Sequence, residues 1–138
     1  GVAAGKIVGE PVSTLDLAST FYDYAGIAQP AALQSRSLRR LLGGSADTRD
    51  VAYSEWHVHA SRCGVGLNLR TVRTKTHKCT FELASGAGEL YDLANDPAEM
   101  DNRFDEPGCA TVQKELHDMM RARPGVVRSD LAEPIGMA

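Results

Sequence analysis

The feature that most constrains the fold is a series of short segments of alternating polarity between residues 51 and 93. The segments VAYSEW, LNLRTVRT, THKCTFEL and ELYDL occupy residues 51–56, 67–74, 76–83 and 89–93. Each has the length of one β-strand, and turn-forming sequences such as SGAG separate them. Links this short favour antiparallel pairing between strands that are consecutive in the sequence. We therefore predict a small antiparallel sheet of about four strands.

Two amphipathic helices flank this predicted sheet. The first runs from Ser13 to Gly26, because Ser13 and Asp16 are spaced almost as in a capping box and Gly26 suits a left-handed C-terminal residue. The second covers residues 109–123. Its apolar stripe consists of Val112, Leu116, Met119 and Met120. We predict that this stripe packs against the sheet. On the third strand, alternation predicts one shared face for His77, Cys79, Phe81 and Leu83.

A further helix start follows the last predicted strand. Asp96 is placed to cap backbone N–H groups, and Pro97 suits the first helical position, where its missing donor costs nothing. Glu99 lies three residues after the cap and can reach back to it, as in a capping box. We therefore predict that a capped helical turn leads the chain away from the edge of the sheet.

The composition is that of an ordinary globular domain. The 138 residues suffice for one core, and the net charge of -3 provides no basic surface for nucleic acid. No apolar run approaches the roughly 20 residues of a membrane span. Cys63, Cys79 and Cys109 form an odd set without close pairing, which favours reduced thiols and, slightly, a cytoplasmic over a periplasmic location. Because the chain starts at Gly1 and not at Met, without a signal peptide, we expect a processed chain or a piece of a longer one.

The densest polar cluster is EWHVHASRC, residues 55–63. His57 and His59 are two residues apart, so in a strand they would share a face, and a His-x-His pair can bind one metal ion. Further ligands at a familiar spacing are lacking, so we predict no metal site. Two alternatives remain open, a ligand contact made by His57, His59 and Arg62, or a structural role. A Gly-x-Ser-x-Gly nucleophile motif is also lacking, and this chemistry alone supports no enzyme.

The order of the motifs resembles the C-terminal part of the sulfatase family, within the alkaline-phosphatase-like superfamily. The matching stretches are VSTLDLASTFYDYAGI, SLRRLLGG, VAYSEWH, RTVRTKTHKCTFE and GELYDLANDPAEMDNRFDEP, followed by a final helix, and the resemblance covers roughly residues 5–123. The EWH…SR stretch is most similar to bacterial choline-sulfatase-like or phosphonate-monoester-hydrolase-like branches. Ser19 replaces a proline of the family pattern, and His77 and Cys79 replace a tyrosine and an aliphatic residue.

The resemblance implies an α+β fold in which the small sheet packs against the C-terminal helix. It assigns residues 1–50 to a linker segment with a helix, which docks on a large α/β domain that this sequence lacks. Residues 51–124 then form the sulfatase C-terminal subdomain, and residues 125–138 form a tail.

The family's catalytic groups are expected outside this sequence. Sulfatases use a formylglycine made in a Cys-x-Pro-x-Arg motif and a divalent metal, usually calcium. Cys63, Cys79 and Cys109 do not begin that motif, so we expect no catalytic or metal-binding residue here and an inactive isolated chain. The implied parent hydrolyses sulfate esters. The alternatives are a phosphonate or phosphate ester hydrolase of the same superfamily, or a non-enzymatic α+β binding module.

The resemblance also implies partners. They are the N-terminal catalytic domain of the same protein and a sulfate-ester substrate, and neither nucleic acid nor membrane is among them. Because the loop after the first strand lies near the pocket mouth in the family, His57, His59 and Arg62 are expected to line the substrate-pocket rim. Separation from the large domain would uncover Ile7, Val8 and the apolar face of helix 14–25, so either a homodimer or a disordered first dozen residues is expected.

Overall fold

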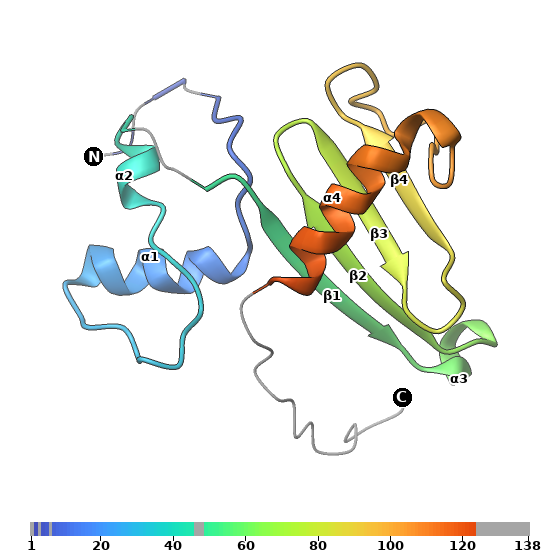
Figure 1. Ribbon diagram of the computed structural model, residues 1–138. Helices are drawn as coiled ribbons and strands as arrows, with labels where there is room; N and C mark the ends of the chain where they lie inside the picture. Colours follow the sequence, from blue (N-terminus) through green and yellow to red (C-terminus); the bar gives the residue numbers. More distant parts are fainter. Residues whose placement is uncertain (1, 3, 6, 46–48, 124–138) are drawn as a thin grey trace.

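The computed structural model describes residues 2, 4–5, 7–45 and 49–123. It has two parts, a helical N-terminal segment and a sheet covered by a helix (Figure 1). The predicted tail, residues 125–138, lies outside the described residues. The proposed boundaries of the C-terminal subdomain, with the linker segment at residue 50 and with the tail at residue 124, remain predictions. Among the described residues, helices are too short or too polar to cross a lipid bilayer.

Four strands form one antiparallel sheet with the order β1-β2-β3-β4. The strands are β1 (Ala52–Val58), β2 (Leu67–Arg73), β3 (His77–Glu82) and β4 (Gly88–Asp92). Each strand pairs with its neighbour in sequence, which confirms the predicted pairing. A short helix, α3 (Ala60–Cys63), lies between β1 and β2.

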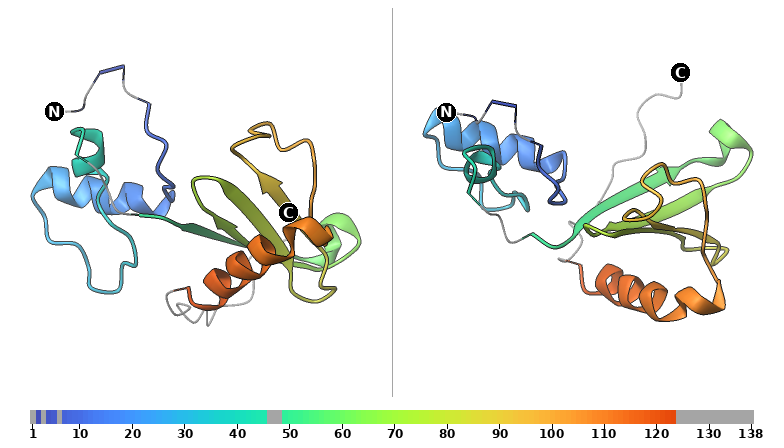
Figure 2. Two further views of the ribbon diagram at one scale, coloured as in Figure 1. Left: turned by 45° about the horizontal axis from the view of Figure 1, so that its top comes forward. Right: turned by 90° about the horizontal axis from the view of Figure 1, so that it is seen from above.

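One face of the sheet is covered by α4 (Ala110–Arg121), which follows the 3-10 turn η1 (Pro107–Cys109) (Figure 2). The buried core contains Val72, Cys79, Phe81, Leu90, Leu116 and Met120. This confirms the α+β fold, with the C-terminal helix packed on the sheet. One predicted core position is wrong, because Met119 lies at the margin of the α4 stripe and is exposed. The face predicted for the third strand is shorter than expected, because β3 ends at Glu82 and Leu83 lies beyond it.

The outer edge of β4 is covered by the segment that follows it. The Leu90 N–H donates to Asn102 Oδ1, and the Arg103 N–H donates to the Leu90 carbonyl. Gly88 lets this segment approach, because a Cβ at Gly88 would lie 2.3 Å from the Phe104 ring. The backbone groups that an edge strand leaves open are thereby partly paired.

The predicted helix start at Asp96 is wrong. Residues 96–99 form a turn, and Glu99 has a φ of 57°, which ends any helical course at that residue. The Asp96 carboxylate accepts from the Met100 and Asp101 N–H groups. Glu99 does not reach back to Asp96, because its carboxylate lies 2.5 Å from Lys78 Nζ on β3. A tertiary ion pair therefore replaces the predicted capping box.

The N-terminal segment contains α1 (Leu15–Ala25) and α2 (Arg39–Leu42). The predicted helix over residues 13–26 is confirmed, with Gly26 left-handed at its end. Ser13 donates its N–H to Asp16 Oδ2, which is the reciprocal half of the predicted capping box. In Figure 2, α1 and α2 lie away from α4, toward the opposite side of the sheet.

Candidate functional site

The three predicted rim residues lie where β1 leads into α3. His57 is the penultimate residue of β1, His59 is the N-cap of α3, and Arg62 lies within α3. Gly64 ends this short helix in a left-handed conformation, with a φ of 81°, before the chain enters β2. The structure thus places all three residues in one connection at an end of the sheet.

His57 belongs to a polar network between β1 and β2. Its Nε2 lies 3.1 Å from Arg70 Nη2, and Arg70 is almost fully buried. Arg70 Nε lies 3.1 Å from Glu55 Oε1, in an ion pair without hydrogen-bond geometry. Arg123, just after α4, donates from Nε to the same Glu55 oxygen at 2.8 Å. Two guanidinium groups therefore meet at the Glu55 carboxylate, and the His57 imidazole contacts one of them, that of Arg70.

The sequence prediction missed Arg70 and Arg123. The register that pairs Glu55 with Arg70 is a signal that could have identified the first contact, because opposite charges directly across a sheet attract. Arg123 lies 68 residues from Glu55, and only tertiary packing joins them. The network restricts the orientation of His57, since its imidazole is held by the nearly buried Arg70 side chain.

His59 has a different role. Its Nδ1 lies 3.2 Å from the Ser61 N–H, which donates to it, and 3.0 Å from Ser61 Oγ. Because β1 ends at Val58, His57 and His59 do not lie on one strand face, and the condition for a His-x-His metal pair is not met. Within the described residues, three or more metal-ligating side chains of the His, Cys, Asp and Glu types do not gather at one point.

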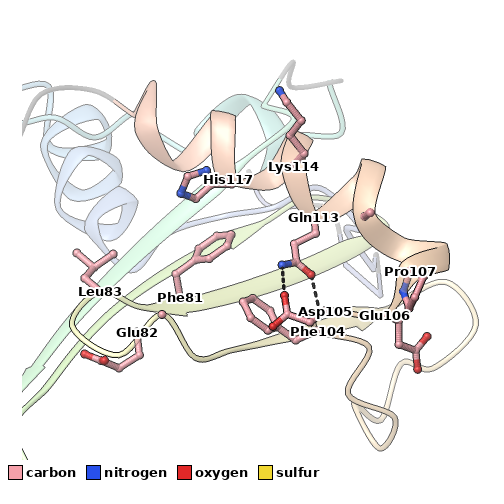
Figure 3. Close-up of a pocket in the computed structure, with 12 residues that line it drawn as sticks. Phe81, Glu82, Leu83, Phe104, Asp105, Glu106, Pro107, Gln113, Lys114 and His117 are labelled. Carbon is pink, nitrogen blue, oxygen red and sulfur yellow. Dashed lines mark hydrogen bonds between the residues drawn. The ribbon is translucent and has the colours of Figure 1, made fainter.

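A groove of about 580 Å³ lies between the β3–β4 turn and the first turns of α4 (Figure 3). Asp105 and Gln113 bind each other across it through two hydrogen bonds of 2.8 Å. His117 packs edge-on against Phe81, with ring centroids 5.2 Å apart. Since these polar groups satisfy one another, the groove is explained by the packing of α4 on the sheet.

Glu82 at the same turn is also satisfied internally. Hydrogen bonds from the Ser85 hydroxyl and N–H, together with the N–H groups of Asn68 and Ala84, lower the pKa of Glu82 to about 2. The carboxylate therefore anchors the hairpin and offers no poised acid or base near neutral pH.

The N-terminal segment presents an apolar stripe on α1. Leu17, Phe21 and Tyr24 follow one another at helical spacing and are exposed, Phe21 to 69%. The buried side of α1 is polar instead, with Asp16, Ser19 and Thr20 turned inward. Arg49 holds Asp16 by a two-pronged ion pair, and the Arg36 N–H also donates to it.

These contacts set the ionisation of Asp16. Burial alone would raise its pKa, but the hydrogen bonds from Arg49, Ser13 and Arg36 hold the pKa below its ordinary value. The pair fixes α1 to the chain that leads into β1. The apolar stripe, by contrast, remains largely exposed among the residues that the structure describes, although the Arg39 guanidinium lies over the Tyr24 ring, 4.9 Å from its centroid.

Comparison with protein families identifies residues 1–124 with the family described as N-sulphoglucosamine sulphohydrolase, C-terminal. An N-acetylglucosamine-6-O-sulfatase of Bacteroides thetaiotaomicron is 31% identical over 86% of this chain and 22% of its own length. A Δ4,5-hexuronate-2-O-sulfatase of the same organism is 36% identical over 74% of this chain and 21% of its own. The chain thus spans about a fifth of the length of these curated relatives.

Solved structures that are similar to this chain include a sulfatase as well. A 2-O GAG sulfatase matches with a TM-score of 0.73 and 32% identity, over 85% of this chain and 26% of the other. A phosphonate monoester hydrolase from Silicibacter pomeroyi matches with a TM-score of 0.67 over 88% of this chain and 27% of the other, but at 24% identity, which shows a shared fold alone.

Proposed function

This chain belongs to the N-sulphoglucosamine sulphohydrolase C-terminal family, the C-terminal domain of sulfatases, and on that premise we propose that the full-length protein hydrolyses a sulfate ester. The observation that carries the proposal is the family match over nearly the whole chain. Two curated sulfatases are 31% and 36% identical to this chain and the 2-O GAG sulfatase structure is 32% identical, whereas the phosphonate monoester hydrolase is 24% identical. A sulfatase is therefore favoured over a phosphonate or phosphate ester hydrolase.

The substrate class proposed is a sulfated sugar. The two curated relatives act, by their names, on sulfated N-acetylglucosamine and on sulfated hexuronate. A third similar structure, at 30% identity, holds the substrate D-glucosamine-2-N,6-O-disulfate. The nucleophile, expected as formylglycine, and calcium would belong to the N-terminal catalytic domain. The location of these catalytic groups outside the present sequence is supported by the lack of a Cys-x-Pro-x-Arg motif in it.

The first role proposed for this chain is to dock on that catalytic domain through α1. Exposed Leu17, Phe21 and Tyr24 form a stripe that an apolar partner surface would bury. Burial of such side chains typically contributes about 1.5–3 kcal/mol each. In the isolated chain the same stripe favours a homodimer. The free thiols of Cys79 and Cys109 are compatible with the proposed cytoplasmic location.

The second role proposed is at the substrate-pocket rim. His59 and Arg62 lie in the exposed connection between β1 and β2, and Arg62 offers a planar set of donors for a sulfate or carboxylate group. His57 is held by Arg70, so its contribution would be a fixed imidazole at the base of this connection. These residues would set substrate preference and would not take part in bond cleavage.

The activity is tested with the full-length protein. We expect it to release sulfate from a sulfated monosaccharide in the presence of calcium, and a phosphonate monoester to be a poor substrate. The isolated chain should be inactive under the same conditions. Mass spectrometry should detect formylglycine in the N-terminal part. Efficient phosphonate cleavage without sulfate release would overturn the sulfatase proposal.

The rim role is tested by alanine variants of the full-length protein at His57, His59 and Arg62. We expect a raised KM or an altered substrate choice, with formylglycine and calcium content unchanged. Arg73→Ala is the matched control, because Arg73 is also an exposed cation but lies at the other end of β2. If all three rim variants behave like the control on every sulfated sugar, the rim assignment is wrong.

A further inference from the structure

Arg70 is a cation that the fold buries between β1 and β2, next to the rim residue His57. It is only 8% exposed, and a charge withdrawn from water to this degree needs partners. Its Nη1 donates to the Leu69 carbonyl at 3.0 Å, and its Nη2 lies 3.1 Å from His57 Nε2. The carboxylate with which it pairs is that of Glu55, whose Oε1 lies 3.1 Å from Arg70 Nε. The guanidinium is therefore fixed on several sides, and the His57 ring forms one of them.

The Glu55 carboxylate is shared between two cations. Arg123, just after α4, donates from Nε to the same Glu55 oxygen at 2.8 Å, and its Nη1 donates to the Met120 carbonyl. Arg123 thereby ties Glu55 to the end of α4. The ion pairs that Glu55 makes with described residues are with these two arginines and do not include His57. Glu55 is thus occupied and does not accept a hydrogen bond from the His57 ring.

The contact between Arg70 and His57 determines which ring nitrogen carries the proton. A guanidinium has N–H donors and no acceptor, so a hydrogen bond from Nη2 needs a lone pair on His57 Nε2. An imidazole with a lone pair on Nε2 is neutral and carries its proton on Nδ1. The His57 side chain is exposed, and within the described residues its Nδ1 has no hydrogen-bond partner. The geometry therefore leaves His57 with one N–H available to a ligand, at Nδ1.

His59, two residues further on, is held in the opposite form. The Ser61 N–H donates to His59 Nδ1 at 3.2 Å, so in this ring Nδ1 has the lone pair. The proton of His59 accordingly lies on Nε2. Strand register fixes the first ring and helix capping fixes the second, so the connection between β1 and β2 presents two imidazoles of different tautomers.

We propose that Arg70 is a positioning residue for substrate recognition, which holds His57 as a neutral imidazole that donates from Nδ1 to an uncharged oxygen of the sulfated sugar. The inference rests on the proposed function and deepens it, because it adds Arg70 to the rim and specifies the group that His57 recognises. A hydroxyl or amide oxygen accepts such a hydrogen bond. Binding of a charged group of the sugar then falls to Arg62, whose planar guanidinium suits sulfate and carboxylate. Arg70 acts through His57 and does not touch the substrate.

The two tautomers can be observed directly by NMR in the isolated chain with isotopically labelled histidine. The chain has four histidines, and the signals lost in His57→Gln and in His59→Gln assign the two rings. At neutral pH, long-range proton–nitrogen correlations should show the proton on Nδ1 for His57 and on Nε2 for His59. A His57 ring protonated on Nε2, or on both nitrogens, would overturn the proposal. This measurement needs no substrate, so its result is independent of the sulfatase assignment.

Kinetics of the full-length enzyme test the positioning role. Arg70→Met removes the hydrogen bond to His57, and we expect KM for the sulfated monosaccharide to rise about 3- to 10-fold with kcat little changed, as the loss of one hydrogen bond implies. The double variant with His57→Ala should be no worse than either single variant, because both changes remove the same contact. Arg73→Met, at an exposed cation of the same strand, is the control and should leave KM unchanged. Additive losses in the double variant would show that Arg70 does not act through His57.

Two substitutions at His57 separate a hydrogen-bond donor from a positive charge. His57→Asn keeps an N–H donor close to the place of Nδ1, whereas His57→Lys supplies a cation. We expect a KM near that of the parent for the first and a KM like that of His57→Ala for the second. The reverse order would contradict the proposal. Both variants retain Arg70, so they decide the matter even where loss of the buried guanidinium unfolds Arg70→Met. A parent enzyme that releases no sulfate would refute the proposed function, while the tautomers in the isolated chain would still decide the state of His57.

Discussion

In the sheet and α4 most buried side chains are apolar, whereas in α1 they are polar. Val72, Leu90 and Leu116 fill the first region, while Asp16 and Ser19 fill the inner side of the second. The apolar residues of α1 face outward instead. The sheet and α4 thus have an apolar core of their own. The α1 helix is held by hydrogen bonds and ion pairs, and its apolar surface is exposed to solvent.

The difference teaches that two parts of one family domain can differ in how far their stability depends on the rest of the protein. A sheet with one covering helix closes a two-layer core and is expected to unfold cooperatively. A single helix with a polar inner side gains little from burial and depends on the geometry of a few polar contacts. The predictions below test this contrast in the isolated chain, from the largest expected effect on stability to the smallest.

The largest effect is expected in the core beneath α4. Leu116 is only 2% exposed, so Leu116→Ala should lower the free energy of unfolding by about 3 kcal/mol through lost burial and the cavity left behind. Met119→Ala on the same helix is the control, because Met119 is partly exposed. Urea unfolding followed by circular dichroism measures both. Similar losses for the two variants would show that α4 does not close the core as described.

A smaller and local effect is expected in the N-terminal segment. Asp16→Asn should weaken the attachment of α1 by about 2 kcal/mol, because Arg49 would lose its charged partner. Hydrogen exchange should accelerate in residues 15–25 and stay unchanged in β2 and β3. Asp23→Asn is the control, since the Asp23–Arg39 pair is far more exposed. Simultaneous acceleration in the sheet would contradict the independence of the two regions.

The same pair predicts a pH dependence. The pKa of Asp16 is lowered in the folded chain, so its contribution is complete above the ordinary value of 3.8 and is lost as the pH falls through the folded value. Protection of the α1 amides, measured relative to their intrinsic exchange rates, should therefore fall on acidification, and Asp16→Asn should abolish that response.

Much of the fold could be predicted from the sequence because its signals are local. Alternation and short turns predicted four strands and their order, and the stripe around Leu116 predicted the covering helix. The turn at Asp96 could not be predicted, because Glu99 binds Lys78, which lies 21 residues away. A capping motif is a local signal, and a tertiary ion pair outweighed it.

The candidate site was less predictable for the same reason. The sequence identified His57, His59 and Arg62 as one polar cluster, and the structure keeps them in one connection. Arg70, which holds His57, is 13 residues away and reaches it only through the strand register. Whether these residues serve a rim remains a prediction, because the groups they would face belong to another part of the protein.

Close packing at the edge of the sheet provides the next test. A Cβ at Gly88 would lie 2.3 Å from the Phe104 ring and 2.6 Å from the Thr80 carbonyl oxygen, so Gly88→Ala should cost about 1–2 kcal/mol. Gly108→Ala is a matched control, because a Cβ there meets no described atom within 4 Å. Thermal unfolding of both variants measures the difference. An unaffected Gly88→Ala variant would mean that residues 102–104 do not pack against β4.

The β3–β4 hairpin should respond to acid through Glu82. Its pKa of about 2 lies below the ordinary value of 4.5, so its stabilising contribution is complete above pH 4.5 and is lost as the pH falls toward 2. Glu82→Gln should be less stable than the parent at neutral pH, and this difference should shrink between those two pH values. Glu89→Gln, an exposed neighbour on β4, is the control. A difference that does not change with pH would exclude the hydrogen-bonded carboxylate as its cause.

The smallest effect on stability is expected at the most exposed position of the α1 stripe. Phe21 is 69% exposed, so Phe21→Ser should change the free energy of unfolding of the isolated chain by less than about 0.5 kcal/mol.

The association of the chain should nevertheless change, because Phe21 contributes most of the exposed aromatic surface proposed to form the homodimer. Analytical ultracentrifugation should show a dimer for the parent chain and a larger monomer fraction for Phe21→Ser. Tyr22→Ser on the same helix, outside the stripe, should leave the dimer unchanged. In the full-length protein the expectation reverses, since the stripe is proposed to be buried there against the N-terminal domain: Phe21→Ser should lower Tm clearly while the oligomeric state stays the same. A parent chain that is monomeric at every concentration would refute the homodimer, and an unchanged Tm in the full-length variant would refute docking through α1.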